Sequence, residues 1–310
     1  MILNTGSRTD IPAFYADWFY RRVRAGEVLS RSPYDAARIF RYRLRPDVVD
    51  AIVFCTKNPR PMLDRLDALA VFRQVWHITI TPYGPDIEPG VPEKEDVMDS
   101  LRALSRRLGA RAVTWRYDPV FLTEKYPVAF HIAAFERMAA ALAGYTEACV
   151  ISFLDLYVKT RRNFPEGREV APEDRLRLGQ AFAESARRHG MRLYACLEGD
   201  DLRPFGVDTS GCLAAPAIER AIGQPLAVPR LSPARRGCAC LLGADIGAYN
   251  TCAHGCRYCY ANYDTRTVAE NRRRHDPASP LLIGHLYPGD QIRDARQESW
   301  LSPQMSLDLD

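Results

Sequence analysis

Short apolar segments rich in β-branched and aromatic residues alternate with helical patterns along the first two thirds of the chain. Six of these segments are predicted as strands: 1–5, 51–56, 75–81, 111–117, 148–154 and 191–197. Their near-continuous apolar character is typical of strands in a parallel sheet that helices cover. The alternation predicts an α/β fold, either a parallel β/α barrel or a doubly wound sheet. We favour a partial or full barrel.

The segments between the strands carry the end signals of helices. Segment 172–189 begins with Pro-Glu-Asp and ends with Arg-Arg-His-Gly, so anions precede cations along the helix dipole. Segment 92–109 begins with proline and acidic residues, carries leucines at helical spacing and ends at Gly109. Segment 126–143 is alanine-rich and precedes a glycine, and a further helix is expected to open at Asp10.

The pattern changes after about residue 222, where Gly, Pro, Cys and Arg become frequent. We therefore divide the chain into a barrel domain over 1–225, a Cys-rich segment over 226–275 and a C-terminal tail over 276–310.

Charge, hydropathy and cysteine content restrict the cellular compartment and the kinds of partner that we expect. The 310 residues carry a net charge of +4, which suits an anionic partner without requiring one. No apolar run approaches the roughly 18 residues of a membrane span, and we see no signal peptide. The nine cysteines are an odd number. Reduced thiols serving metals in a cytoplasmic protein therefore fit better than a disulfide framework.

Polar residues follow every predicted strand, where sites form in parallel α/β folds. The candidate cofactor-binding residues among them are Arg8, Asp10, Lys57, Glu88 and Glu198. The candidate catalytic residues are Arg116, Asp118, Asp155 and Lys159. We expect Arg116 and Asp118 either to pair with each other or to hold a substrate carboxylate or phosphate. The alternative for any one of these residues is an ordinary solvated loop.

Three cysteines lie close together near the C-terminus, as Cys252-x3-Cys256-x2-Cys259. Thiolates at these spacings in one glycine-bearing loop can converge on an iron–sulfur cluster and leave its fourth iron open. Zinc is the alternative metal, with Cys238 and Cys240 adding ligands to a four-thiolate site.

The triplet, with Tyr258 before its last cysteine, resembles the signature of the radical S-adenosylmethionine (SAM) superfamily. The resemblance implies a β/α barrel in which Cys252, Cys256 and Cys259 hold a 4Fe–4S cluster and SAM binds the open iron. Reductive cleavage of SAM would then give a 5′-deoxyadenosyl radical, with flavodoxin or ferredoxin as electron donor. Tyr258 would lie near the cluster or adenine, and Glu88 and Glu198 are positional candidates for SAM contacts.

The motif follows all the predicted strands, whereas radical SAM enzymes usually carry it after the first one. Either the cluster loop folds back over the barrel mouth, or the barrel is permuted. The superfamily's Gly-Gly-Glu element has no clear match in the sequence. The whole chain also resembles a bacterial family known as domain of unknown function 1848, through stretches that include "SRTDIPAF", "TPYGPDIEPGVP" and "DIGAYNTCAHGCRYCYAN". That family name implies no activity.

The remaining cysteines allow a second metal site. Four thiols outside the triplet are its candidate ligands: Cys196, Cys212, Cys238 and Cys240. The alternative is that Cys196, which lies in an apolar strand, is simply buried. Cys55 and Cys149 also lie in apolar strands and are predicted to be core residues.

Two segments bear on partners. Three consecutive arginines at 272–274 either bind phosphate or form a solvated helix end. Residues 304–309 resemble the peptide by which bacterial repair proteins dock into the DNA sliding clamp. We therefore predict a radical SAM-like enzyme with a nucleic-acid lesion as substrate, by analogy with the radical SAM lyase that repairs spore DNA photoproducts. The alternative is a non-catalytic zinc or iron–sulfur adaptor.

Overall fold

A computed structural model describes residues 1–230 and 237–302. Its centre is a six-stranded parallel sheet in the order β1-β4-β5-β6-β7-β8. The strands are β1 (Ile2–Asn4), β4 (Ala51–Thr56), β5 (Gln74–Thr79), β6 (Val113–Val120), β7 (Ala148–Phe153) and β8 (Arg192–Ala195). This sheet confirms the predicted α/β class. A closed barrel is not shown, since no ladder joins β1 to β8 within the described residues.

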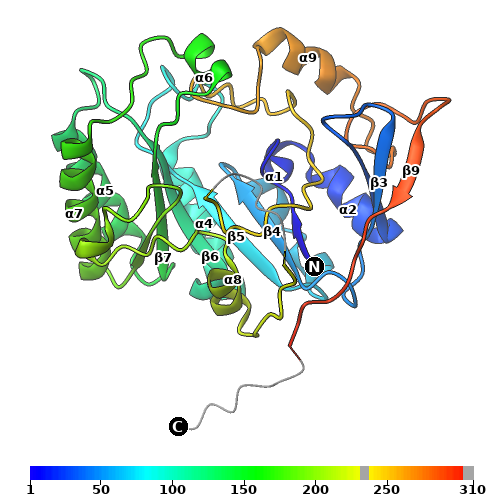
Figure 1. The fold of residues 1–310 in the computed structure, drawn as a ribbon, viewed down its shortest axis with the longest axis horizontal. Helices are drawn as coiled ribbons and strands as arrows, with labels where there is room; N and C mark the ends of the chain where they lie inside the picture. Colours follow the sequence, from blue (N-terminus) through cyan, green and yellow to red (C-terminus); the bar gives the residue numbers. More distant parts are fainter. Residues whose placement is uncertain (231–236, 303–310) are drawn as a thin grey trace.

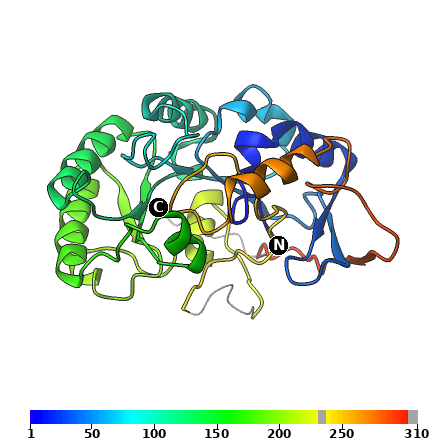
Figure 2. The ribbon, with the colours of Figure 1, turned by 90° about the horizontal axis from the view of Figure 1, so that it is seen from above.

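Helices connect the strands and cover one face of the sheet (Figures 1 and 2). The α-helices are α1 (Ile11–Phe14), α2 (Ala16–Ala25), α3 (Arg60–Leu63), α4 (Lys94–Leu108), α5 (Val128–Leu142), α6 (Val158–Asn163), α7 (Pro172–Arg188), α8 (Ala215–Ile222) and α9 (Thr265–Arg273). Three short 3₁₀ helices are η1 (Leu66–Leu69), η2 (Ala110–Ala112) and η3 (Arg203–Phe205). None of the helices in these two described stretches is long and apolar enough to cross a membrane.

Alternation along each strand gives the sheet two different buried faces. Phe54, Trp76 and Trp115 pack in the main core, which also holds apolar residues of α4, α5 and α7. Their neighbours Val53 and Val75 point to the other face, in a second cluster with residues from α8 and the Cys-rich segment. The Cys-rich segment therefore covers the sheet face opposite to the main helices.

A second, smaller sheet lies beside the first and was not predicted (Figure 1). Strand β2 (Glu27–Arg31) pairs antiparallel with β3 (Arg38–Arg43), and β3 pairs parallel with β9 (Gln291–Asp294). Strand β9 lies within the predicted C-terminal tail, so part of that tail is ordered against the N-terminal quarter of the chain. The domain boundaries at 225 and 275 stay predictions.

The carboxyl ends of the strands carry the elements that form the site. Helix α6 follows β7, and α9 follows the cysteine loop; both lie at the same end of the molecule (Figure 1). The side-chain amide of Asn163, the last residue of α6, donates a hydrogen bond to the Tyr263 carbonyl, just before α9, at 3.2 Å. The late cysteine loop is thereby held at the end of the sheet where parallel α/β folds form their sites.

Candidate functional site

A cavity of about 270 Å³ opens at the carboxyl ends of the strands. Residues at or just after the carboxyl ends of all six parallel strands line it, and the cysteine loop closes one side. Seven cysteines contribute to its walls: Cys55, Cys196, Cys212, Cys240, Cys252, Cys256 and Cys259. The late triplet and the early strand ends therefore face the same space.

The predicted site residues divide into two sets. Those that line the cavity are Asp10, Lys57, Arg116, Asp118, Asp155 and Tyr258, together with all the cysteines named above. Those that do not line it are Arg8, Glu88, Lys159, Glu198 and Cys238. Cys55, predicted as a plain core residue, is at the cavity wall, whereas Cys149 is buried in the main core as expected.

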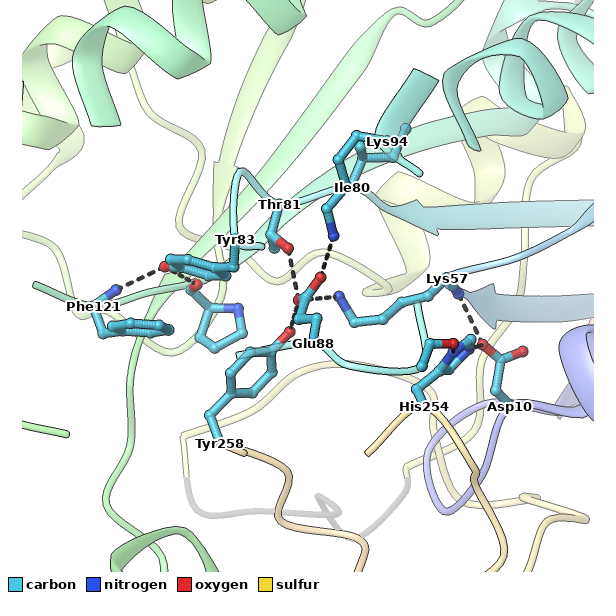
Figure 3. A network of polar contacts seen from close by, with 12 residues as sticks. Asp10, Lys57, Ile80, Thr81, Tyr83, Glu88, Lys94, Phe121, His254 and Tyr258 are labelled. Atoms are coloured by element: carbon cyan, nitrogen blue, oxygen red, sulfur yellow. Dashed lines mark hydrogen bonds and ion pairs between the residues drawn. The ribbon is translucent and has the colours of Figure 1, made fainter. Parts of the chain in front are cut away.

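Glu88 is the centre of a buried ionic cluster beneath the cysteine loop (Figure 3). Lys57 donates to Oε1 at 2.8 Å and Thr81 at 2.7 Å, Lys94 donates to Oε2, and the Tyr258 hydroxyl donates to Oε1. Burial opposes the charged carboxylate, but the two ammonium groups outweigh it and lower the pKa of Glu88 to about 2. Glu88 therefore stays ionised and positions two lysines and Tyr258, while a contact to SAM stays a prediction.

Tyr258 joins the cysteine loop to an aromatic cluster. Its ring packs edge-on to Tyr83 at a centroid distance of 6.1 Å and is tilted against Phe121 at 6.0 Å. The Lys57 ammonium lies 5.7 Å from the Tyr258 ring centroid, within range of a cation–π contact. The residue before the last cysteine is therefore an anchor of the loop.

The cysteine loop also docks through its backbone on the segment after β5. The amide of Gly90 donates to the His254 carbonyl at 2.8 Å, and the amide of Arg257 donates to Ile87 at 3.0 Å. A Cβ at Gly90 would lie 2.6 Å from the Ala253 carbonyl oxygen. This close approach requires glycine at position 90.

His254, inside the motif, is buried and hydrogen-bonded at both ring nitrogens. Nε2 lies 2.8 Å from the Asp10 carboxylate, and Nδ1 lies 3.0 Å from the Gly90 carbonyl (Figure 3). Asp10 also accepts from Thr56 at 2.6 Å and from the Lys57 amide at 2.8 Å. His254 is thus occupied as a structural link and presents no free nitrogen to a metal.

Arg116 and Asp118 form an ion pair at the cavity wall, one of the two outcomes expected for them. The Ser152 hydroxyl donates to Asp118 as well. The other side of the guanidinium faces sulfur, because Nη1 lies 3.6 Å from Cys212 Sγ. The half-buried guanidinium group of Arg116 therefore lies between a carboxylate and a thiol group.

Three sulfur atoms gather beside Arg116. Cys212 Sγ lies 3.6 Å from that of Cys196 and 3.8 Å from that of Cys240, and all three residues are buried. Hydrogen bonding with Cys196 and Cys240 lowers the pKa of Cys212, although burial works against its thiolate. Among the described residues these are the cysteine, histidine or carboxylate groups close enough to share one ion.

The three sulfur atoms of the triplet do not all lie within 4.8 Å of one another, because the described residues contain one group of potential metal ligands that close, and it is Cys196, Cys212 and Cys240. The triplet is therefore more widely spaced. Burial raises the pKa of Cys252 and Cys259, and raises that of Cys256 to about 12. Such thiols stay neutral without a partner, whereas a bound cation would draw off their protons.

The predicted residues outside the cavity have other partners. Arg8 pairs with Asp245 at 2.9 Å, and both are nearly buried. Glu198 accepts from the Phe153 amide at 2.7 Å and from Arg175 at 3.1 Å; burial raises its pKa to about 7. The Lys159 ammonium lies 4.8 Å from the centroid of the Tyr249 ring. The predicted cofactor contacts of Arg8 and Glu198 and the predicted catalytic role of Lys159 stay predictions.

Sequence reasoning missed Lys94 and Asp245. Lys94 begins α4 between Glu93 and Glu95, a position where the sequence gives no sign that a lysine is half-buried. Asp245 precedes the cysteine motif, and its partner Arg8 is 237 residues away in the sequence. Asp245 opens the stretch "DIGAYNTCAHGCRYCYAN" that carries the triplet, and this position was the one feature of the sequence that could have drawn attention to it.

The model of a family described as domain of unknown function (DUF1848) matches residues 2–261. The protein therefore belongs to the DUF1848 family, and the match spans both the sheet and the cysteine triplet. No curated protein and no solved structure matches the chain.

Proposed function

We propose that this protein is a radical SAM-like enzyme whose cavity at the strand ends is the active site. The observation that supports the proposal most is the position of Cys252, Cys256 and Cys259, which line the same cavity as the polar strand ends. In this proposal the open sheet is a partial β/α barrel, and the late loop folds back over its mouth.

The donor set fits a 4Fe–4S cluster. Three thiols of one loop face the cavity, and the half-buried ammonium group of Lys57 favours the anionic forms of Cys256 and Cys259. Their spacing, wider than that of ligands sharing a single ion, also agrees with thiolates that bind separate irons.

When bound, the cluster would pass one electron from reduced flavodoxin or ferredoxin to SAM, giving methionine and a 5′-deoxyadenosyl radical that takes a hydrogen atom from the substrate. The protein's own residues bind and orient. Lys57 and Arg116 place fixed positive charge at the wall, where a carboxylate or phosphate would be held. Asp118 and Asp155 offer acceptors for the hydroxyl or amino groups of a ligand.

A nucleic acid is the substrate class that the cavity rim favours. Tyr157 and Tyr260 line the cavity, are 39% and 46% exposed, and have ring centroids 5.8 Å apart. Partly exposed aromatic rings beside cations are the groups on which bases stack. Arg273 and Arg274, at the end of α9, add exposed positive charge.

The proposed clamp-binding peptide, residues 304–309, lies outside the described residues. Docking on a sliding clamp therefore stays a prediction, which a pull-down with the full-length chain tests. Cytoplasmic localisation is likewise part of the proposal.

Anaerobic reconstitution with iron and sulfide tests the function. We expect a brown protein that releases 5′-deoxyadenosine from SAM under dithionite. The Cys256→Ala variant should lose the iron of this cluster, whereas Cys149→Ala, a change in the main core, should keep it. Full iron content in Cys256→Ala would refute the ligand assignment. A wild-type protein without an iron chromophore or SAM cleavage would support the metal-binding adaptor instead.

A further inference from the structure

The second group of cysteines comes from three segments that are separate in the sequence. Cys196 directly follows β8, Cys212 precedes α8, and Cys240 belongs to the Cys-rich segment. Each is less than 8% exposed, and all three line the cavity. Three buried thiols from three loops meeting at one point is an arrangement that apolar packing alone does not require.

The sulfur spacing distinguishes between kinds of site. A disulfide would bring two sulfurs to about 2.0 Å. A tetrahedral ion with bonds of about 2.3 Å places its thiolate sulfurs roughly 3.8 Å apart. The separations of 3.6 Å and 3.8 Å agree with the edges of one such tetrahedron. Thiolates of an iron–sulfur cubane each bind a different iron, and therefore lie farther apart.

The surroundings of the three sulfurs suit bound thiolates. The amide of Leu213 donates to Cys240 Sγ at 3.3 Å, and Arg116 Nη1 lies 3.6 Å from Cys212 Sγ. Such donors stabilise the negative charge that three thiolates retain around a divalent ion. The amide of Leu241 donates to Leu213 at 3.0 Å and so fastens the loop of Cys240 to the loop of Cys212.

Cys238 and Cys55 lie outside this close group in the part of the chain that the structure describes. Cys238 does not line the cavity at all. The ligand set is therefore three thiolates, which leaves one position of a tetrahedron unfilled by protein. Closed four-ligand sites are structural, whereas three-ligand sites that keep a position for water or substrate are the catalytic kind.

We propose that Cys196, Cys212 and Cys240 bind a single Zn²⁺ ion whose fourth position faces the cavity and accepts a water or a sulfur or oxygen atom of the substrate. This site is mononuclear, in contrast to a second iron–sulfur cluster, and excludes Cys238 from the predicted four-thiol set. The inference does not rest on the proposed function, because the ion would be held whether or not the triplet binds a cluster.

The test uses the full chain with the Cys256→Ala change, so that iron at the triplet does not interfere. This protein is loaded with Co²⁺ alone, and the thiolate-to-cobalt charge-transfer band and the tetrahedral d–d bands are recorded. We expect one Co²⁺ per chain, competed off by Zn²⁺. Cys212→Ser and Cys240→Ser should lower the charge-transfer intensity by about one third or abolish binding, since each removes one of three thiolates. Cys149→Ser and Cys238→Ser, the matched controls, should leave it unchanged.

Two further measurements use protein in which all three ligand cysteines are present, so they do not depend on whether a ligand variant folds. Titration of the zinc-loaded protein with an organomercurial should release the ion as three thiols react. Added small-molecule thiol should shift the cobalt d–d bands, because it enters the open position. Equal cobalt binding by Cys212→Ser, or loss of the band in Cys238→Ser, would overturn the ligand set. An iron–sulfur chromophore that persists in Cys256→Ala and disappears when Cys212→Ser is added would overturn the mononuclear site. Cobalt d–d bands that do not move on addition of thiol would overturn the open position.

Discussion

The imidazole of His254 lies 2.8 Å from the carboxylate of Asp10, so the cysteine loop is bonded to the first helix across 244 residues of sequence. Asp10 caps α1 by accepting from the Ala13 amide at 3.0 Å. The other ring nitrogen of His254 faces the Gly90 carbonyl. One side chain thus joins three segments around the cavity.

Replacing His254 with Ala should loosen the cysteine loop. Two buried hydrogen bonds are lost and the Asp10 carboxylate loses a partner, which should cost about 3 kcal/mol. Hydrogen exchange of peptides covering 250–262 should accelerate, and the reconstituted protein should lose iron faster. His285→Ala is the control, because that side chain is 65% exposed. Unchanged exchange over 250–262 would argue against the link.

Gly90→Ala should displace the same loop by steric contact. The new Cβ would lie 2.6 Å from the Ala253 carbonyl oxygen and 2.9 Å from that of His254. We expect a loss of about 1–3 kcal/mol in the free energy of unfolding, as for overpacked positions, measured by urea titration. Gly243→Ala is the matched control, since nothing lies within 4 Å of its added Cβ. Equal stability of the two variants would contradict the close approach.

Glu88→Gln should uncouple the two lysines from the loop. Removing one member of a buried ionic group costs about 3–5 kcal/mol, because the remaining charges stay buried. Tyr258→Phe removes only one hydrogen bond to Glu88 and should cost about 1 kcal/mol.

The acid dependence gives a second readout for Glu88. Its pKa falls on folding from 4.5 to about 2, so its contribution is complete above pH 4.5 and declines as the pH drops toward about 2. The unfolding free energy of the wild type should therefore fall more steeply over this range than that of Glu88→Gln. If the unfolding free energies of the two proteins fall in parallel as the pH drops, Glu88 is not the source of the acid dependence.

Glu198 should affect the pH dependence of stability in the opposite direction to Glu88. Burial raises its pKa from 4.5 to about 7 in the folded protein. The unfolded state then ionises first, so the free energy of unfolding should decrease as the pH rises from 4.5 to about 7, by up to about 3 kcal/mol. Glu198→Gln should flatten this slope, whereas Glu184→Gln, an exposed change on α7, should retain it. Urea titrations across this range provide the comparison.

The parallel sheet was predictable because its strands are buried on both faces. Segments 51–56 and 148–154 gave β4 and β7 almost to the residue. The smaller sheet escaped prediction because its strands carry a different signal. Strand β3 reads RIFRYR, and β9 is exposed at every position, so neither shows the continuous apolar run that buried strands need.

The site was predictable in its residue types and less so in its partners. Spacing within one loop identified the triplet, since a loop of that length keeps its cysteines close. The grouping of Cys196, Cys212 and Cys240 depends on how β8, α8 and the Cys-rich segment pack together, which no local pattern specifies. For the same reason the sequence did not predict the contacts of Glu88 with Lys57, Lys94, Thr81 and Tyr258.

Asp245 lies in the short stretch that connects the two groups of cysteines. Its carboxylate accepts from the Ser7 amide at 2.8 Å and pairs with Arg8, while the adjacent Ile246 amide donates to Asn4 at 3.1 Å. The connector is thus clamped at its midpoint to the rigid edge of the sheet. Because hydrogen bonds hold Asp245 and Ile246 in place, a displacement of Cys240 should not propagate along the connector to Cys252. We therefore expect a metal bound at Cys196, Cys212 and Cys240 to leave the position of the triplet unchanged.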